Sequence, residues 1–210
     1  MTGVPGRAGG LPGSVGFRVG LVGAAVLGLV LGAAACGGGD DAASDLPEPA
    51  GGADGAIDLS DPAAGPESPS GRTLLEGFTE VEVRVTTGAG TVLDPCLLLA
   101  DEAAEWGQGL MEVIDLGDYP GMVFAFDEDR TGTFFMRNTP TPLSIAFLDA
   151  GGRLVSSTDM EPCEDRDGCP TYGADGPYRY AVEVPRGMLA TVGLDDPDAV
   201  LELGGDCDPV

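Results

Sequence analysis

Residues 178–184 read Tyr178-Arg179-Tyr180-Ala181-Val182-Glu183-Val184, and they alternate between two sets of side chains. Both tyrosines and both valines fall in one set, while Arg179, Ala181 and Glu183 fall in the other. Successive side chains of a β-strand point to opposite faces, so this pattern predicts a strand. Pro185 lacks a backbone N–H for a sheet and is expected to end it.

Similar short segments flank this one on both sides. Expected strands cover residues 81–85, 91–99, 122–126, 132–136, 143–148, 154–160 and 199–203, and short helices are expected at 101–108 and 188–192. Glycine, proline and aspartate separate these segments, as in β proteins with tight turns. The pattern predicts a mainly β (α+β) domain, a partly closed barrel or a sandwich, with one or two short helices.

The composition excludes several functions. The 210 residues contain 35 acids and 10 arginines, with no lysine and no histidine, and the formal charge is −25. Without histidine there is no Ser-His-Asp triad and no histidine-ligated zinc, and without lysine there is no Schiff base. Nucleic acid is not an expected partner, because phosphate binding needs a basic surface.

The first 36 residues resemble a secretion signal. Arg7 and Arg18 make the start positive, and residues 19–35 (VGLVGAAVLGLVLGAAA) are uncharged and apolar. This run is shorter than the ~20 residues of a membrane-spanning helix. The end, Ala33-Ala34-Ala35-Cys36, resembles a bacterial lipoprotein signal in which the cysteine is lipidated. Ordinary cleavage after the alanines and an uncleaved signal anchor are the alternatives.

The five cysteines are explained by one lipid and two disulfides. If Cys36 carries lipid, the other four cysteines can all pair in an oxidising compartment. We predict Cys163–Cys169, which closes a short acidic loop, and Cys96–Cys207, which joins the two ends of the domain. Four cysteines allow three connectivities, so this pairing is a hypothesis. The expected location is the extracytoplasmic face of the cell membrane, with a secreted soluble protein as the alternative.

A linker is expected between the signal and the domain. Residues 37–72 are almost wholly Gly, Ala, Pro, Ser, Asp and Glu, a composition that predicts disorder, and they carry a net charge of −7. The domain is then residues 73–210, long enough for its own core and left with a charge of −20.

Residues 109–172 carry a series of motifs that together resemble one known family. The motifs are Gly109-Leu110-Met111, Pro120–Phe126, Phe134–Thr139, Pro142–Phe147, Met160–Cys163 and Cys169–Tyr172. In order and spacing they resemble the family called domain of unknown function 192. The resemblance extends over about residues 80–205 and implies a small mixed β-barrel-like fold. It implies no activity, because none is established for the family.

Two departures from the family pattern bear on function. Phe135 and Arg137 replace the usual Trp and Lys, and Ser144 replaces an acid. A cation and an amide after an aromatic strand can fix an anionic or sugar-like ligand, although Asn138-Thr139-Pro140 can equally be a plain turn. The candidate ligand-binding residues are Arg137, Asn138, Thr139, Met111 and Ser144.

The sequence therefore favours a membrane-tethered domain that binds a small ligand or an envelope protein. A carboxylate- or arginine-based enzyme and a purely structural envelope protein are the alternatives. No cofactor is expected. No metal site is expected either, since the methionines lie among Leu, Val and Phe and the acidic loops lack the full ligand set of a calcium loop.

Overall fold

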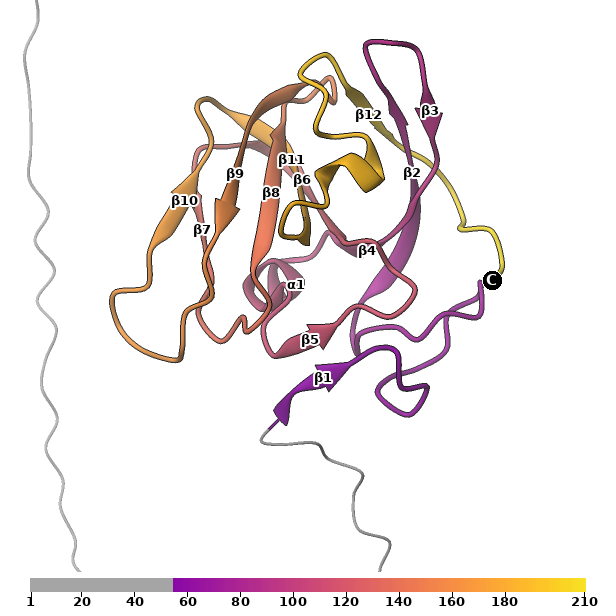
Figure 1. Cartoon of the computed structure of the whole chain (residues 1–210), viewed down its shortest axis with the longest axis vertical. Coiled ribbons are helices and arrows are strands. Elements are labelled where there is room, and N and C mark those ends of the chain that lie inside the picture. The colour runs from indigo at the N-terminus through magenta and orange to yellow at the C-terminus, as the bar shows by residue number, and fades with distance from the viewer. Residues whose placement is uncertain (1–54) are drawn as a thin grey trace, which may run out of the picture. The chain divides into compact units, whose positions relative to one another are not determined.

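The computed structural model describes residues 55–210 and is built around one large curled sheet (Figure 1). Its strands run in the order β12-β2-β4-β6-β11-β8-β9, with β3 paired to β2. The strands of this sheet are β2 (Thr79–Thr86), β3 (Val92–Leu93), β4 (Cys96–Ala100), β6 (Met122–Arg130), β8 (Leu143–Leu148), β9 (Leu154–Met160), β11 (Tyr178–Pro185) and β12 (Val200–Leu203). All neighbours are antiparallel except β4 and β6.

The two edges of the sheet meet at one end. Arg153, just before β9, forms an isolated antiparallel bridge with Val200 of β12. The amide of Leu201 donates to the carbonyl of Gly152 at 2.8 Å. A Cβ at Gly152 would lie 1.8 Å from the Leu201 carbonyl oxygen, so only glycine permits this approach. The sheet is thus partly closed, which confirms the expected β-barrel-like, mainly β class.

Both faces of the sheet are buried, because side chains of one strand alternate between two hydrophobic clusters. Ala181 lies in one cluster with Phe124 and Phe147. Val182 and its neighbours lie in the other. We call the first the α1 face, because Trp106 of helix α1 (Ala103–Gln108) packs on it. The second is the η2 face, covered by the 3-10 helix η2 (Leu189–Val192).

Two small sheets complete the domain. Strand β1 (Ile57–Asp58) pairs in parallel with β5 (Val113–Asp115). Strand β7 (Thr133–Phe135) pairs antiparallel with β10 (Thr171–Gly173). Helix α1 begins with a capping box, in which Glu102 accepts from the backbone of Glu105 and the Glu105 carboxylate accepts the Glu102 amide at 2.9 Å. These elements frame the α1 face, on which the candidate site lies.

The expected linker ends earlier than predicted. Residues 55–72 are ordered and pack on the domain: Leu59 is 3% exposed, and Ser68 and Ser70 are buried. Ser70 donates to the Glu80 carboxylate at 2.9 Å, and Arg72 donates to the Asp208 carbonyl at 2.9 Å. The composition suggested disorder, but these partners lie elsewhere in the chain. Residues 37–54, the signal segment and Cys36 lie outside the described residues.

Both predicted disulfides are present. Cys96 at the start of β4 is joined to Cys207 near the C-terminus. Cys163 is joined to Cys169 across a short loop. The first bond ties the C-terminal segment to the main sheet, and the second closes the acidic loop 164–168. Among residues 55–210, no helix has the length and apolar character needed to cross a membrane.

Candidate functional site

An aromatic pocket of about 250 Å³ opens on the α1 face. Its walls come from α1 and the following loop, from β6 and from the β7 region. The aromatic residues that line it are Trp106, Phe124, Phe126, Phe134, Phe135 and Tyr178. Their rings contact one another: Trp106 lies 5.0 Å from Phe126, and Phe124 meets Phe134 edge-on at 5.0 Å. The fold thus builds a preformed apolar cavity with room for a small ligand, slightly below the ~300–1,000 Å³ typical of sites for drug-sized molecules.

Glu183 is the buried acid of this pocket, and Thr139 is the other buried polar residue that lines it. The Glu183 backbone is paired on both sides, with Met122 of β6 and Ile145 of β8, so it sits in the middle of the sheet. Glu183 comes two residues after Ala181 in the strand, so both side chains point to the α1 face. The Glu183 side chain lines the pocket there. The residue is 4% exposed. An acid in this position is the feature most suited to recognising a ligand.

No described group offsets the cost of burying the Glu183 carboxyl. Burial raises the pKa of Glu183 to about 8, and neither a hydrogen bond nor a nearby charge from the described residues offsets this. A buried carboxyl group without a partner is costly to a fold, so its presence needs a reason. At neutral pH the group holds a proton that it can donate, and it ionises just above that pH.

Arg130 and Tyr178 are the other ionisable groups that line the pocket among the described residues. The Arg130 guanidinium lies 5.0 Å from the ring centroid of Trp106 and 5.1 Å from that of Phe126. The Tyr178 hydroxyl donates to the Gly132 carbonyl at 3.2 Å. Burial raises the pKa of Tyr178, so its phenol stays neutral at physiological pH. The pocket therefore has one buried acid and one exposed cation.

Three of the five predicted ligand-binding residues line one or both of two hollows, and Arg137 and Ser144 line neither. Met111 and Thr139 line the aromatic pocket. Thr139 also lines a second, more open hollow of about 510 Å³ with Asn138, next to Cys163 and Asp165. Asn138 has a positive φ of 53° and occupies the expected turn, where its carbonyl accepts the Glu112 amide. Thr139 is the residue common to both hollows.

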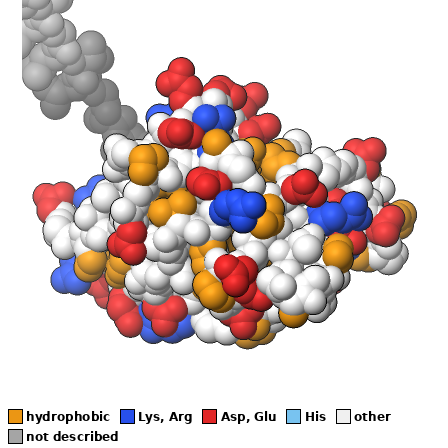
Figure 2. Space-filling model, turned by 90° about the horizontal axis from the view of Figure 1, so that it is seen from above, with side chains coloured by type: hydrophobic (Ala, Val, Ile, Leu, Met, Phe, Trp, Pro, Cys, Tyr) orange, Lys and Arg blue, Asp and Glu red, His pale blue; other side chains and the backbone are white. Residues whose placement is uncertain are grey.

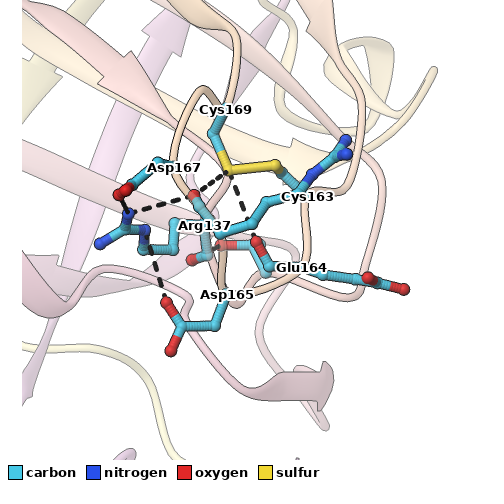
Figure 3. Close-up of polar contacts among 8 residues, drawn as sticks. Arg137, Cys163, Glu164, Asp165, Asp167 and Cys169 are labelled. Carbon is cyan, nitrogen blue, oxygen red and sulfur yellow. Dashed lines mark hydrogen bonds and ion pairs between the residues drawn. A yellow bond between two sulfur atoms is a disulfide. The ribbon is translucent and has the colours of Figure 1, made fainter.

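Arg137 contacts the disulfide loop (Figure 3). Its guanidinium donates to the Asp167 carboxylate and to the Arg166 carbonyl, both at 3.0 Å. It also lies 3.5 Å from the Asp165 carboxylate. The isolated bridges of Cys163 with Arg137 and Thr139 place this loop beside the turn after β7. The cation expected to meet a ligand is thus engaged by acids of its own chain.

Replacing Arg137 with alanine is expected to lower the free energy of unfolding by at most about 1 kcal/mol, because its ion pairs are solvent-exposed. It should leave ligand affinity of the aromatic pocket unchanged. Urea unfolding and calorimetric titration of Arg137→Ala measure the two effects. A tenfold loss of affinity in the folded variant would show that Arg137 contributes to ligand binding.

Ser144 lies on β8 and is 1% exposed. Its hydroxyl donates to the Asp159 carboxylate at 2.6 Å and accepts the Gly187 amide at 2.9 Å. Neither the aromatic pocket nor the second hollow includes it. Its hydrogen bonds tie β8 to β9 and to the turn after β11, which supports the sheet behind the pocket.

A second polar cluster lies around Glu80, away from the pocket. Burial alone would raise the pKa of Glu80, but hydrogen bonds from Ser70 and Tyr119 lower it overall. The Tyr119 hydroxyl donates to this carboxylate at 2.7 Å, and the pKa of Tyr119 rises through burial and this contact. Glu80 also lies close to the sulfurs of Cys96 and Cys207, but both are committed to their disulfide. The cluster fastens residues 66–74 to β2.

The sequence pattern did not single out Glu183 or Arg130. The alternation of residues 178–184 grouped Glu183 with Arg179, as if both faced solvent. The usable signal lay in the neighbouring segments: Leu143–Leu148 is buried throughout, and so is the start of β6. A strand between two such neighbours is buried on both faces, and an acid within it must be buried as well.

The fold and the pocket define this protein as a small curled β domain with a ligand-sized aromatic cavity. The chain belongs to the DUF192 family, described as uncharacterized ACR, whose family model matches residues 84–201. Glu183, Arg130 and all the other residues that line the pocket lie within the matched region. A search of curated proteins found no match.

The solved structures that are similar to the chain include the following two. One is a protein from Sinorhizobium meliloti 1021 described as a candidate transcription regulator: it is 25% identical, with a TM-score of 0.52, and the match covers 62% of this chain and 98% of that one. The other is a protein of unknown function from Novosphingobium aromaticivorans DSM 12444. It is 28% identical, with a TM-score of 0.50, and the match covers 71% of this chain and 99% of that one.

Proposed function

We propose that this protein is a membrane-tethered, extracytoplasmic domain that binds a small ligand in its aromatic pocket. The observation that carries the proposal is the Glu183 carboxyl, a buried acid without a partner among the described residues that lines an apolar cavity. Ligand sites typically combine apolar walls with a few placed polar groups. Met111 and Thr139 contribute to the walls.

Binding fits the pocket better than hydrolysis by two carboxylates. That chemistry needs a pair of acids about 5–10 Å apart across the scissile bond. Glu183 is the one acid that lines the aromatic pocket among the described residues. The proposal therefore assigns recognition, and not catalysis, to this carboxyl.

A nucleic-acid ligand does not fit the charge of this chain, although one similar protein is described as a candidate transcription regulator. The formal charge is −25. On the face seen in Figure 2, red acidic side chains surround the few blue arginines, and the blue atoms form no continuous stripe. Phosphate backbones need such a stripe, so a small molecule is the better ligand.

Replacing Gly107 with tryptophan is expected to abolish ligand binding by filling the pocket. Gly107 is a helical residue of α1 that lines the pocket, and a Cβ there meets no atom within 4 Å. The new ring has apolar walls to pack against, and leaving glycine favours the helix. We expect fragments of small aromatic and branched alkyl compounds to raise the Tm of the wild type but not of Gly107→Trp. At a ligand concentration of 100 Kd the stabilisation is about 2.7 kcal/mol.

Gly205→Trp is the matched control. This glycine is exposed after β12, a Cβ there also meets nothing within 4 Å, and it does not line the pocket. It should respond to fragments as the wild type does. If no fragment stabilises the wild type, or if both variants still bind equally well, the proposed function is wrong.

Replacing Cys36 with serine is expected to move the protein from the membrane fraction to the soluble fraction. Serine cannot carry the thioether-linked lipid, and the tether proposed from the Ala33–Cys36 motif would be lost. Fractionation of the native host, with detection of the domain in pellet and supernatant, measures this. Retention in the membrane at wild-type levels would favour an uncleaved signal anchor, and a soluble wild-type protein would favour simple secretion.

A further inference from the structure

We propose that the ligand of the aromatic pocket is a small organic cation, with an ammonium group carried on a branched apolar body. This inference rests on the ligand-binding function proposed above and specifies the chemistry of that ligand. It is carried by the position of Glu183 and by the rings around it.

The first argument is the buried acid. Glu183 is 4% exposed, and its backbone is held between β6 and β8, so its side chain is directed into the pocket. None of the other described residues that line the pocket is an acid, and its one cation, Arg130, is exposed. A buried carboxylate is stabilised most by a cation placed against it. A ligand can supply that cation where the chain does not.

The second argument is the aromatic surface. The negative face of an aromatic ring attracts cations, and several rings around one cavity act together. The protein already places a cation on this surface: the Arg130 guanidinium lies 5.0 Å from the Trp106 centroid and 5.1 Å from the Phe126 centroid. A ligand cation deeper in the pocket would meet Phe124 and Phe134 in the same way.

The third argument compares ligands of other charge. An anion is attracted by Arg130 at the rim but is repelled by the ionised form of Glu183. A neutral ligand uses only the protonated form of Glu183, as a hydrogen-bond donor. A net acidic chain also concentrates cations near its surface and repels anions. The cation is therefore the ligand that the most features favour.

The cation proposal predicts a pH dependence of binding. Burial raises the pKa of Glu183 to about 8, so an incoming cation must displace a proton at lower pH. Affinity should rise about tenfold per pH unit up to about pH 8 and then level off. The other ionisable groups that face the pocket are Arg130 and Tyr178, and the Tyr178 phenol keeps its proton over this range because burial raises its pKa. A neutral acceptor ligand would bind the protonated carboxyl, so its affinity should be constant below about pH 8 and fall above it.

The test uses three probes of nearly the same shape: choline, 3,3-dimethylbutan-1-ol and 3,3-dimethylbutanoate. They are cationic, neutral and anionic. We expect calorimetric titration of the full domain at pH 8 to show choline binding at least about tenfold more tightly than the alcohol, and the carboxylate binding weakest. Glu183→Gln should remove the preference for choline over the alcohol. Arg130→Met should strengthen choline binding a few-fold, because it removes a like charge and keeps an apolar stem.

Several outcomes would overturn the cation proposal. Tightest binding of 3,3-dimethylbutanoate would identify an anion site centred on Arg130, and equal binding of choline and the alcohol would identify an apolar site. Absence of binding by all three probes would overturn the cation proposal as well. The proposed function stays separate, because it depends on the fragment panel and on the contrast between Gly107→Trp and Gly205→Trp. Circular dichroism of each variant verifies that it is folded.

Discussion

Replacing Cys96 and Cys207 together with alanine is expected to lower the free energy of unfolding by about 4–5 kcal/mol. Their disulfide closes a loop of 111 residues in sequence, and in the chain-entropy model a loop of that length restricts the unfolded state strongly. The bond also holds the C-terminal segment, whose backbone pairs with Glu82 and Ser70. Urea unfolding of the oxidised wild type and of the double variant measures the difference. A loss of this size is a large part of the stability of an ordinary domain.

The second disulfide provides the control. Cys163 and Cys169 are only six residues apart, so their replacement should cost about 2 kcal/mol by the same relation. We expect the loss of Cys96–Cys207 to lower the free energy of unfolding more than the loss of Cys163–Cys169, because it closes the longer loop. Equal losses, or a larger loss from the short loop, would show that local packing and not chain entropy sets the contribution of these bonds.

Replacing Glu183 with glutamine is expected to make the domain several kcal/mol more stable than the wild type at pH 9, and about equally stable at pH 4. Burial raises the pKa of Glu183 from an ordinary 4.5 to about 8 in the folded protein. Glutamine keeps the shape of the side chain but carries no charge. Urea unfolding of both proteins at pH 4, 6, 8 and 9 measures the difference.

The sign follows from which state holds the proton. Below pH 4.5 the folded and unfolded states are both protonated at Glu183. Between pH 4.5 and about 8 only the folded state keeps the proton, so the free energy of unfolding falls by about 1.4 kcal/mol per pH unit. Over the whole window the wild type loses about 4–5 kcal/mol relative to a side chain that does not titrate.

Glu202→Gln is the matched control, because Glu202 is an exposed acid on β12. Comparing the two variants separates the effect of one buried carboxyl from the general effect of removing one negative charge. If Glu183→Gln follows the pH dependence of the wild type, the Glu183 carboxyl is not buried as the structure places it. Both proposals for the pocket would then lose their main support.

Much of the main sheet could be predicted from periodicity. Residues 143–148 and 154–160 were expected as strands, and β8 and β9 have those bounds. Runs of apolar and β-branched residues between glycine and proline turns predict strands, and this pattern can be recognised from a few consecutive residues. Cysteine parity, a second local signal, led to both disulfides.

The remaining fold depended on contacts between distant segments. Strands β1, β5 and β10 are two or three residues long and have no periodicity to detect, so only their partners define them. Residues 55–72 have the composition of a linker, yet Leu59, Ser68 and Ser70 find burial or hydrogen bonds far along the chain. Composition measures only what a segment can bury by itself.

The candidate site was predicted in part. Met111 and Thr139 line the aromatic pocket, whereas the Arg137 guanidinium is held by Asp165 and Asp167. The sequence did not reveal Glu183, because an alternating pattern predicts one solvent-exposed face, and only the strand order β6-β11-β8 shows that β11 has none. Strand order is a long-range property, and a single strand's pattern does not contain it.

The most direct test of ligand binding in this pocket is the carboxyl ¹³C signal of Glu183, followed by NMR while each of the three probes is added. The account predicts a saturable shift of this signal with at least one probe in the wild type and in Gly205→Trp, and no shift in Gly107→Trp. A Glu183 signal that none of the probes moves in the wild type, with a titration midpoint near the ordinary 4.5, would contradict it.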